Sequence, residues 1–149
     1  MADTITIGWG KPKIEVKKVG DSAYVAFATP VEDSTQLETT QGDKLEAKIE
    51  GGENEAVRYK ANTYQLTFQV RQAPERTDPI VDVDGVVADE YTVMVTPENP
   101  DAIGCVINRA AVNVQTTFNA AEGLVKTYTF DVLKPASGNQ VKLQVIEPT

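Results

Sequence analysis

The chain has 149 residues, 41% of them hydrophobic and 24% charged, and its formal net charge is −8. These values are typical of one globular domain with an ordinary core and exclude a disordered chain, and no run of residues approaches the roughly eighteen apolar side chains of a membrane span. The excess of acidic groups makes a general attraction to nucleic acid or to an anionic membrane unfavourable, although it would suit a channel through which a polyanion slides.

The amino terminus, Met1 to Ile7, lacks the basic segment and the apolar run of a secretory signal, so we expect synthesis in the cytoplasm. Trp9 follows between Gly8 and Gly10. This side chain could plug one end of the core or stand exposed as a platform on which a sugar stacks, and we expect the plug.

After two short predicted strands at residues 14–16 and 24–27, the segment 31–59 has a different character. It is dense in charge, Gly51-Gly52 interrupts it, and apolar side chains are few. An isolated hairpin of this kind cannot bury much area. Two interpretations stay open: a solvated surface loop, and a charged hairpin arm or loop at about residues 39–55 that becomes ordered only on a neighbouring subunit.

The rest of the chain shows mostly the period of two that is typical of strands with one buried face. The clearest case is residues 64–71, in which four apolar side chains alternate with four polar ones. Turn residues rich in Gly, Pro, Asn and Asp separate the runs. The other predicted strands are residues 91–95, 110–114, 128–132 and 141–145.

Helical signals are weak. Asp78-Pro79 could open a helix within residues 77–90, but β-branched side chains and Gly85 disfavour it, and residues 100–104 are the other candidate. We therefore predict a mainly β fold, a β-sandwich or rolled β-barrel of about eight strands with at most one short flanking helix. No repeat or linker divides the chain, so residues 1–149 are expected to form a single domain.

The usual catalytic and metal-binding side chains are scarce. The sequence has no histidine and one cysteine, Cys105, which removes Ser-His-Asp and Cys-His catalysis and the usual zinc ligand sets. The run Gly8 to Pro12 lacks the spacing of a phosphate-binding loop. The acidic residues between Asp82 and Glu90 do not match a calcium-binding loop, and a solvated loop is expected there. We predict no catalytic residue, no cofactor and no metal, and an enzyme that uses only carboxylates is the least favoured class.

Two stretches resemble a known family. Residues 30–53, PVEDSTQLETTQGDKLEAKIEGGE, are similar to the central segment of tail tube proteins from phages and prophages of Bacteroides-type bacteria. Residues 118–130, FNAAEGLVKTYTF, followed by Leu133-Lys134-Pro135, are similar to the same proteins. The resemblance extends over most of the chain and depends on the placement of charge and glycine.

The resemblance implies a structural role without enzymatic activity. Tail tube subunits form hexameric rings that stack into a hollow tube, and DNA passes through the acidic lumen without specific binding. It implies association with further copies of this chain and with other tail proteins, no membrane, and a location in the bacterial cytoplasm during synthesis and then in the virion tail. Long arms cross the ring interfaces in this family, and the residues expected to make these contacts here are Thr39, Thr40, Gln41, Gly42, Asp43, Lys44, Leu45, Glu46, Gly51, Gly52 and Glu53.

A second class of function fits the composition equally well. An adhesion or ligand-binding β-sandwich without enzymatic activity, such as an immunoglobulin-like module that recognises a glycan or a surface protein, would have the same size and strand content. The absence of a secretion signal argues against it, whereas a role for Trp9 in glycan binding would support it.

Overall fold

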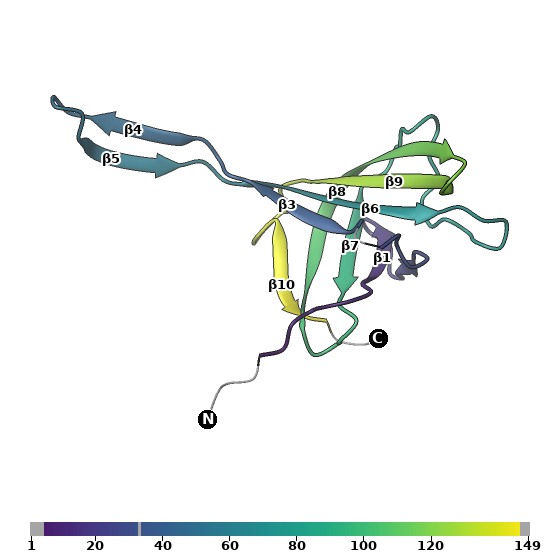
Figure 1. Ribbon diagram of the computed structural model, residues 1–149. Coiled ribbons are helices and arrows are strands. Elements are labelled where there is room, and N and C mark those ends of the chain that lie inside the picture. The colour runs from purple at the N-terminus through teal and green to yellow at the C-terminus, as the bar shows by residue number, and fades with distance from the viewer. Residues whose placement is uncertain (1–4, 33, 147–149) are drawn as a thin grey trace.

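The computed structural model describes residues 5–32 and 34–146 (Figure 1). Outside these ranges lie residues 1–4, Asp33 and residues 147–149. Asp33 belongs to the stretch that resembles tail tube proteins. The described residues form strands and no helix, which confirms the mainly β prediction. They therefore provide no helix that could cross a membrane. The strands are β1 (Lys13–Lys18), β2 (Val25–Ala26), β3 (Gln36–Thr40), β4 (Lys44–Lys48), β5 (Asn54–Tyr59), β6 (Thr63–Arg71), β7 (Tyr91–Thr96), β8 (Ile103–Asn119), β9 (Gly123–Val132) and β10 (Val141–Val145).

The long strand β8 connects two layers of an antiparallel sandwich. The strand order is β2-β1-β7-β8-β9-β6-β3, and β10 pairs with β8 outside this path. The first part of β8 pairs with β7 and β10, whereas its second part, from Ala110 to Asn119, pairs with β9. A strand that leaves one sheet and enters another makes the corner of such a sandwich. The predicted β-sandwich is therefore confirmed.

An aromatic cluster forms the centre of the core. Phe68 of β6 stacks on Tyr128 and Phe130 of β9, with ring centroids 5.4 and 5.6 Å apart. Phe27, just after β2, meets Phe68 and Tyr128 edge-on from the other layer at 5.0 and 4.8 Å. Full burial of each such side chain stabilises the fold by about 1.5–3 kcal/mol. The alternation that predicted β6 and β9 thus marks the residues that join the two layers.

Neither segment considered for a helix forms one. Residues 77–90 are an irregular loop in which Asp84 and Gly85 take φ angles of 50° and 86°, and Val83 and Val86 form a bridge around them. β-branched side chains favour extended backbone, and glycine adopts positive φ without strain. In the second segment, Ile103 already belongs to β8. The described chain has ten strands where about eight were predicted, because β3, β4 and β5 all lie within the charged segment 31–59.

Candidate assembly surfaces

The strands β4 and β5 form a hairpin that projects from the sandwich (Figure 1). They pair only with each other, as a separate two-stranded sheet, within the described ranges. We call residues 41–62 the arm. The predicted bounds, about 39–55, are displaced: Thr39 and Thr40 belong to β3 and pair with β6, and the second strand of the arm continues to Tyr59.

The residues predicted for contact between subunits are therefore divided between two places. Thr39 and Thr40 lie at the end of β3 in the body of the sandwich. The others lie along the arm: Gln41, Gly42 and Asp43 at its root, Lys44, Leu45 and Glu46 in β4, and Gly51, Gly52 and Glu53 at its tip. The pairing of β4 with β5 forms within one chain, so the hairpin takes no strand from a neighbouring subunit.

Local contacts define both ends of the arm. At the tip, Gly51 and Gly52 have φ angles of 93° and 88°, which glycine adopts without strain. At the root, the Gly42 N–H donates to the Asn62 side-chain oxygen at 3.1 Å, and a Cβ on Gly42 would collide with the Lys60 carbonyl. The Gln140 side chain donates to the Asn62 carbonyl at 3.1 Å and joins the root to the body.

The charged side chains of β4 lie on one face of the arm, beside Val57 and Tyr59 of β5. Strand alternation places Lys44, Glu46 and Lys48 on one face, where Glu46 accepts Lys44 at 2.7 Å and lies 3.4 Å from Lys48. The hydrogen bond from Lys44 lowers the pKa of Glu46 below its ordinary value. We call the opposite face, as defined by the same alternation and by the register of β4 with β5, the aliphatic face. It consists of Leu45, Ala47, Ile49, Ala56 and Arg58.

The aliphatic face is not covered by its own chain. Leu45 and Ile49 are 50% and 46% exposed, and every residue of β4 and β5 is exposed. Two-stranded hairpins are at best marginally stable alone, so these side chains contribute little to the stability of a free subunit. Val57 and Tyr59, which the register places beside Glu46 and Lys44 on the other face, are 44% and 53% exposed as well. Both faces of the arm therefore carry uncovered apolar side chains, which mark a surface that contacts another molecule.

A groove of about 880 Å³ lies between β3 and β10. Leu37 of β3 and Leu66 of β6 line one side, and Ile103 and Cys105 of β8 with Leu143 of β10 line the other. In the part of the chain that the structure describes, β3 pairs only with β6 and β10 only with β8. The groove is thus a place where the two layers separate and leave apolar side chains beside unpaired strand edges.

Few charges border the groove. They belong to Lys11, Glu32 and Glu98, and the Glu98 carboxylate accepts the Lys11 backbone N–H at 2.9 Å. Burial raises the pKa of the Cys105 thiol to about 11, so this cysteine is almost entirely protonated at neutral pH and does not act as a nucleophile. The groove therefore offers mainly apolar contact.

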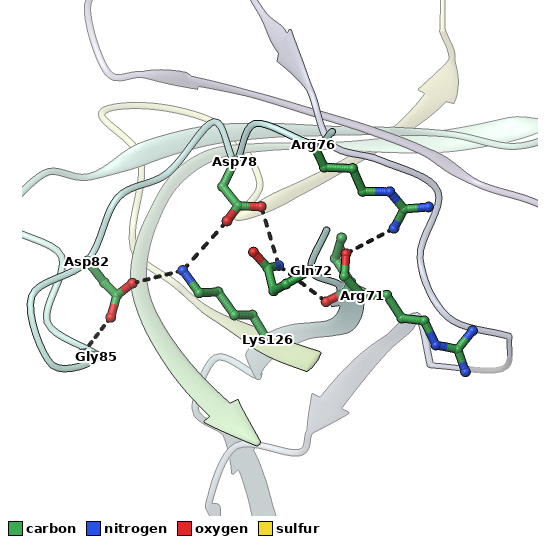
Figure 2. Close-up of polar contacts among 8 residues, drawn as sticks. Arg71, Gln72, Arg76, Asp78, Asp82, Gly85 and Lys126 are labelled. Carbon is green, nitrogen blue, oxygen red and sulfur yellow. Dashed lines mark hydrogen bonds and ion pairs between the residues drawn. The ribbon is translucent and has the colours of Figure 1, made fainter. Parts of the chain in front are cut away.

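A polar cluster at the far end of β6 and β9 holds the loop of residues 72–90 in place (Figure 2). The Lys126 ammonium lies 3.5 Å from Asp78 and 3.7 Å from Asp82, and Gln72 donates to Asp78 at 3.4 Å. Asp82 also accepts the Gly85 N–H at 2.7 Å. These contacts connect two turns of the loop of residues 72–90 to strand β9, so they stabilise the fold.

Tyr128 is fully buried near this cluster. Among the described residues its hydroxyl makes no hydrogen bond. Burial, together with the negative charge of Asp78, raises the pKa of Tyr128 well above its ordinary value. The side chain is therefore neutral and acts in packing.

The other acidic residues considered for a cation are separated. Asp89 pairs with Lys18 at 3.3 Å, and Glu90 binds Arg109 through two hydrogen bonds of 2.9 and 2.8 Å. No three His, Cys, Asp or Glu side chains in residues 5–32 and 34–146 are grouped as metal ligands. Asp89 and Glu90 thus form local ion pairs.

The expectation for Trp9 is wrong. Its side chain is 74% exposed and does not plug the core. The glycines on either side allow the chain to pass close to Pro97 and Glu98, and a Cβ on Gly8 would already touch the Pro97 ring. The backbone, rather than the indole, occupies this end of the sandwich.

Comparison with known proteins gives a match in fold. No protein-family model and no curated protein matches the chain. Its structure is similar to the sheath/tube terminator of an extracellular contractile injection system, PVC, in the extended state, with a TM-score of 0.56 and 14% identity over 96% of this chain and 99% of that chain. It is also similar to the tube-terminating cap of the anti-feeding prophage, with a TM-score of 0.49 and 15% identity over 97% of each chain. The first match shows a shared fold over nearly the whole length.

Proposed function

We propose that this protein is a structural, non-enzymatic subunit of a phage tail or a tail-like machine, and that its copies assemble into hexameric rings that stack as a tube. The observation that carries the proposal is the arm, a hairpin that presents exposed aliphatic side chains beyond the body of its own chain. The fold shared with a terminator of a contractile injection system supports this class of function. The resemblance to Bacteroides-type tail tube proteins supports the tube in particular.

Sheet edges provide a second surface for assembly. Every residue of β3 is exposed, and its outer edge pairs with no strand in the described ranges. An unpaired edge is a template on which another chain can add a strand, and closure of a ring removes such edges. We infer that edge contacts close the ring and that the arm reaches the next ring.

The charge of the chain suits a conduit for DNA. A net charge of −8 per subunit repels a polyanion at the range of the Debye length, about 8–10 Å in physiological salt. DNA would then pass through the lumen without specific binding. High salt should screen this repulsion.

Electron microscopy of the purified chain tests the proposal. At high concentration we expect negatively stained rings with sixfold symmetry, and mass photometry should show a species of six subunits. Stacks of rings indicate a tube subunit, whereas single rings that never stack indicate a terminator like the PVC protein. A chain that stays monomeric at every concentration and does not join tail assemblies would contradict the structural role.

The exposure of Trp9 favours one alternative. A 74% exposed indole beside a glycine-rich backbone could stack on a sugar, as a ligand-binding module requires. Glycan-array binding by the wild type that is lost in Trp9→Ala would support that function. We expect no glycan binding, and unchanged ring formation by Trp9→Ala.

A further inference from the structure

We propose that the groove between β3 and β10 receives the aliphatic face of the arm of a second copy of this chain. This inference rests on the proposed function, because it names the surface that accepts the arm. The occupant is a segment of the same protein, so no additional partner is required.

Strands β8 and β10 form the floor of the groove, and their inward-facing side chains extend past the buried core of the sandwich. The paired residues Val141 and Ile107 are buried, whereas Leu143 is 71% exposed and Ile103 is 66% exposed on the same pair of strands. Paired residues of antiparallel strands share a face, so these side chains point toward the space between the layers. The described residues of the subunit leave this part of the inner face uncovered.

The arm has the chemistry and the size to cover it. Its aliphatic face places Leu45, Ala47 and Ile49 in one row, with Ala56 beside them. A volume of about 880 Å³ lies within the range of about 300–1,000 Å³ that is typical of sites for compact ligands, which suits one hairpin face and not a whole domain. The unpaired edge of β10 can also hydrogen-bond an added strand.

The arm and the groove also carry opposite charges. Arg58 is the one charged residue on the aliphatic face, and Glu32 is an exposed carboxylate among the residues that line the groove. Neither takes part in an ion pair among the described residues. An arm seated in the groove of a neighbour can bring these two opposite charges together.

The contact must form between different copies. The arm extends away from the body of its own subunit (Figure 1), so its aliphatic face cannot reach the groove of the same chain. A contact that joins two different surfaces is heterologous, and repetition of such a contact generates closed rings or open stacks. This geometry agrees with assembly in which each subunit both donates and receives an arm.

Engineered cysteines test the position of the arm. In a Cys105→Ala background, Ala47→Cys would be mixed with Leu143→Cys under mild oxidation, and disulfide-linked dimers would be measured on a non-reducing gel. Lys48→Cys is the matched control, because it is the next residue along β4 and points to the opposite face. We expect about tenfold more dimer with Ala47→Cys, since a disulfide needs Cα atoms within about 7 Å.

A charge exchange tests the same contact without cysteines. Arg58→Glu or Glu32→Arg alone should weaken assembly about tenfold, and the double variant should restore it. If the wild type assembles but the two arm positions cross-link to Leu143→Cys equally, or not at all, the groove is overturned and the proposed function stands. A wild-type chain that forms no assembly by electron microscopy would overturn both.

Discussion

Replacement of residues 41–62 by an Asn-Gly turn should remove the arm and leave the sandwich folded. Thr40 and Thr63 are directly paired in β3 and β6, so two residues suffice to connect them. Asn-Gly favours the type I′ turn of a two-residue hairpin. The change is confined to the surface, because every residue removed is exposed except the half-buried Gly42.

The effect on stability can be bounded from the structure. Shortening a flexible loop about tenfold lowers its closure cost by (3/2)RT ln 10, about 2 kcal/mol, and this is an upper limit because the arm is itself paired. Loss of the 3.1 Å hydrogen bond from Gln140 to the Asn62 carbonyl costs about 1 kcal/mol. The free energy of unfolding should therefore lie between about 1 kcal/mol below and about 2 kcal/mol above that of the wild type.

Two assays separate folding from assembly. Urea unfolding followed by circular dichroism measures stability, and negative-stain microscopy of the same sample counts rings and stacks. We expect a cooperative transition with a free energy within these bounds and no stacked tubes. Normal tubes from the shortened chain would show that tube growth does not need the arm, and loss of the cooperative transition would show that the sandwich depends on it.

Three residues, Gly42, Lys126 and Cys105, make contacts whose effects can be measured separately. Gly42→Ala should displace the root of the arm, because the added methyl group collides with the Lys60 carbonyl. We expect less assembly in sedimentation velocity, and a change of less than about 1 kcal/mol in the unfolding free energy. Lys126→Met should lower the unfolding free energy measured in urea by about 1–3 kcal/mol, because the largely buried carboxylates of Asp78 and Asp82 lose their cation. Lys126→Arg is the control, and its unfolding free energy should fall by less than half as much. Cys105 should react with iodoacetamide at pH 8 about a hundredfold more slowly than a thiol of ordinary pKa, because burial raises its pKa to about 11 and only the thiolate reacts. The reaction rate, measured by mass spectrometry, should rise about tenfold per pH unit. A plateau of the rate near pH 9 would count against this explanation.

The sequence predicted the core strands because burial leaves a pattern. Leu66, Phe68 and Val70 alternate with polar residues, and the same residues are buried between the layers. The strands β3, β4 and β5 leave no such pattern, because all their side chains are exposed. High charge density marked the region, yet nothing in it could show that Thr39 and Thr40 belong to the body and not to the arm.

The groove could not be predicted for a different reason. Its walls come from residues far apart in the chain, such as Leu37, Ile103 and Leu143. The pairing of β10 with β8 places Leu143 and Ile103 together, and the pairing of β3 with β6 places Leu37. The sequence pattern of an apolar side chain in a strand is the same whether or not the opposite layer of the sandwich covers that side chain. Trp9 illustrates the same limit, because its exposure depends on the path of the backbone past Pro97.

Hydrogen–deuterium exchange, read by mass spectrometry, tests most directly whether the arm is the element of assembly. In the free subunit the amides of β4 and β5 should exchange quickly, because a two-stranded hairpin without a core opens at little cost in free energy. In assembled rings or tubes the same amides should become protected by about a hundredfold or more, while those of β6 and β9 change little. Equal exchange in the arm before and after assembly would contradict the account.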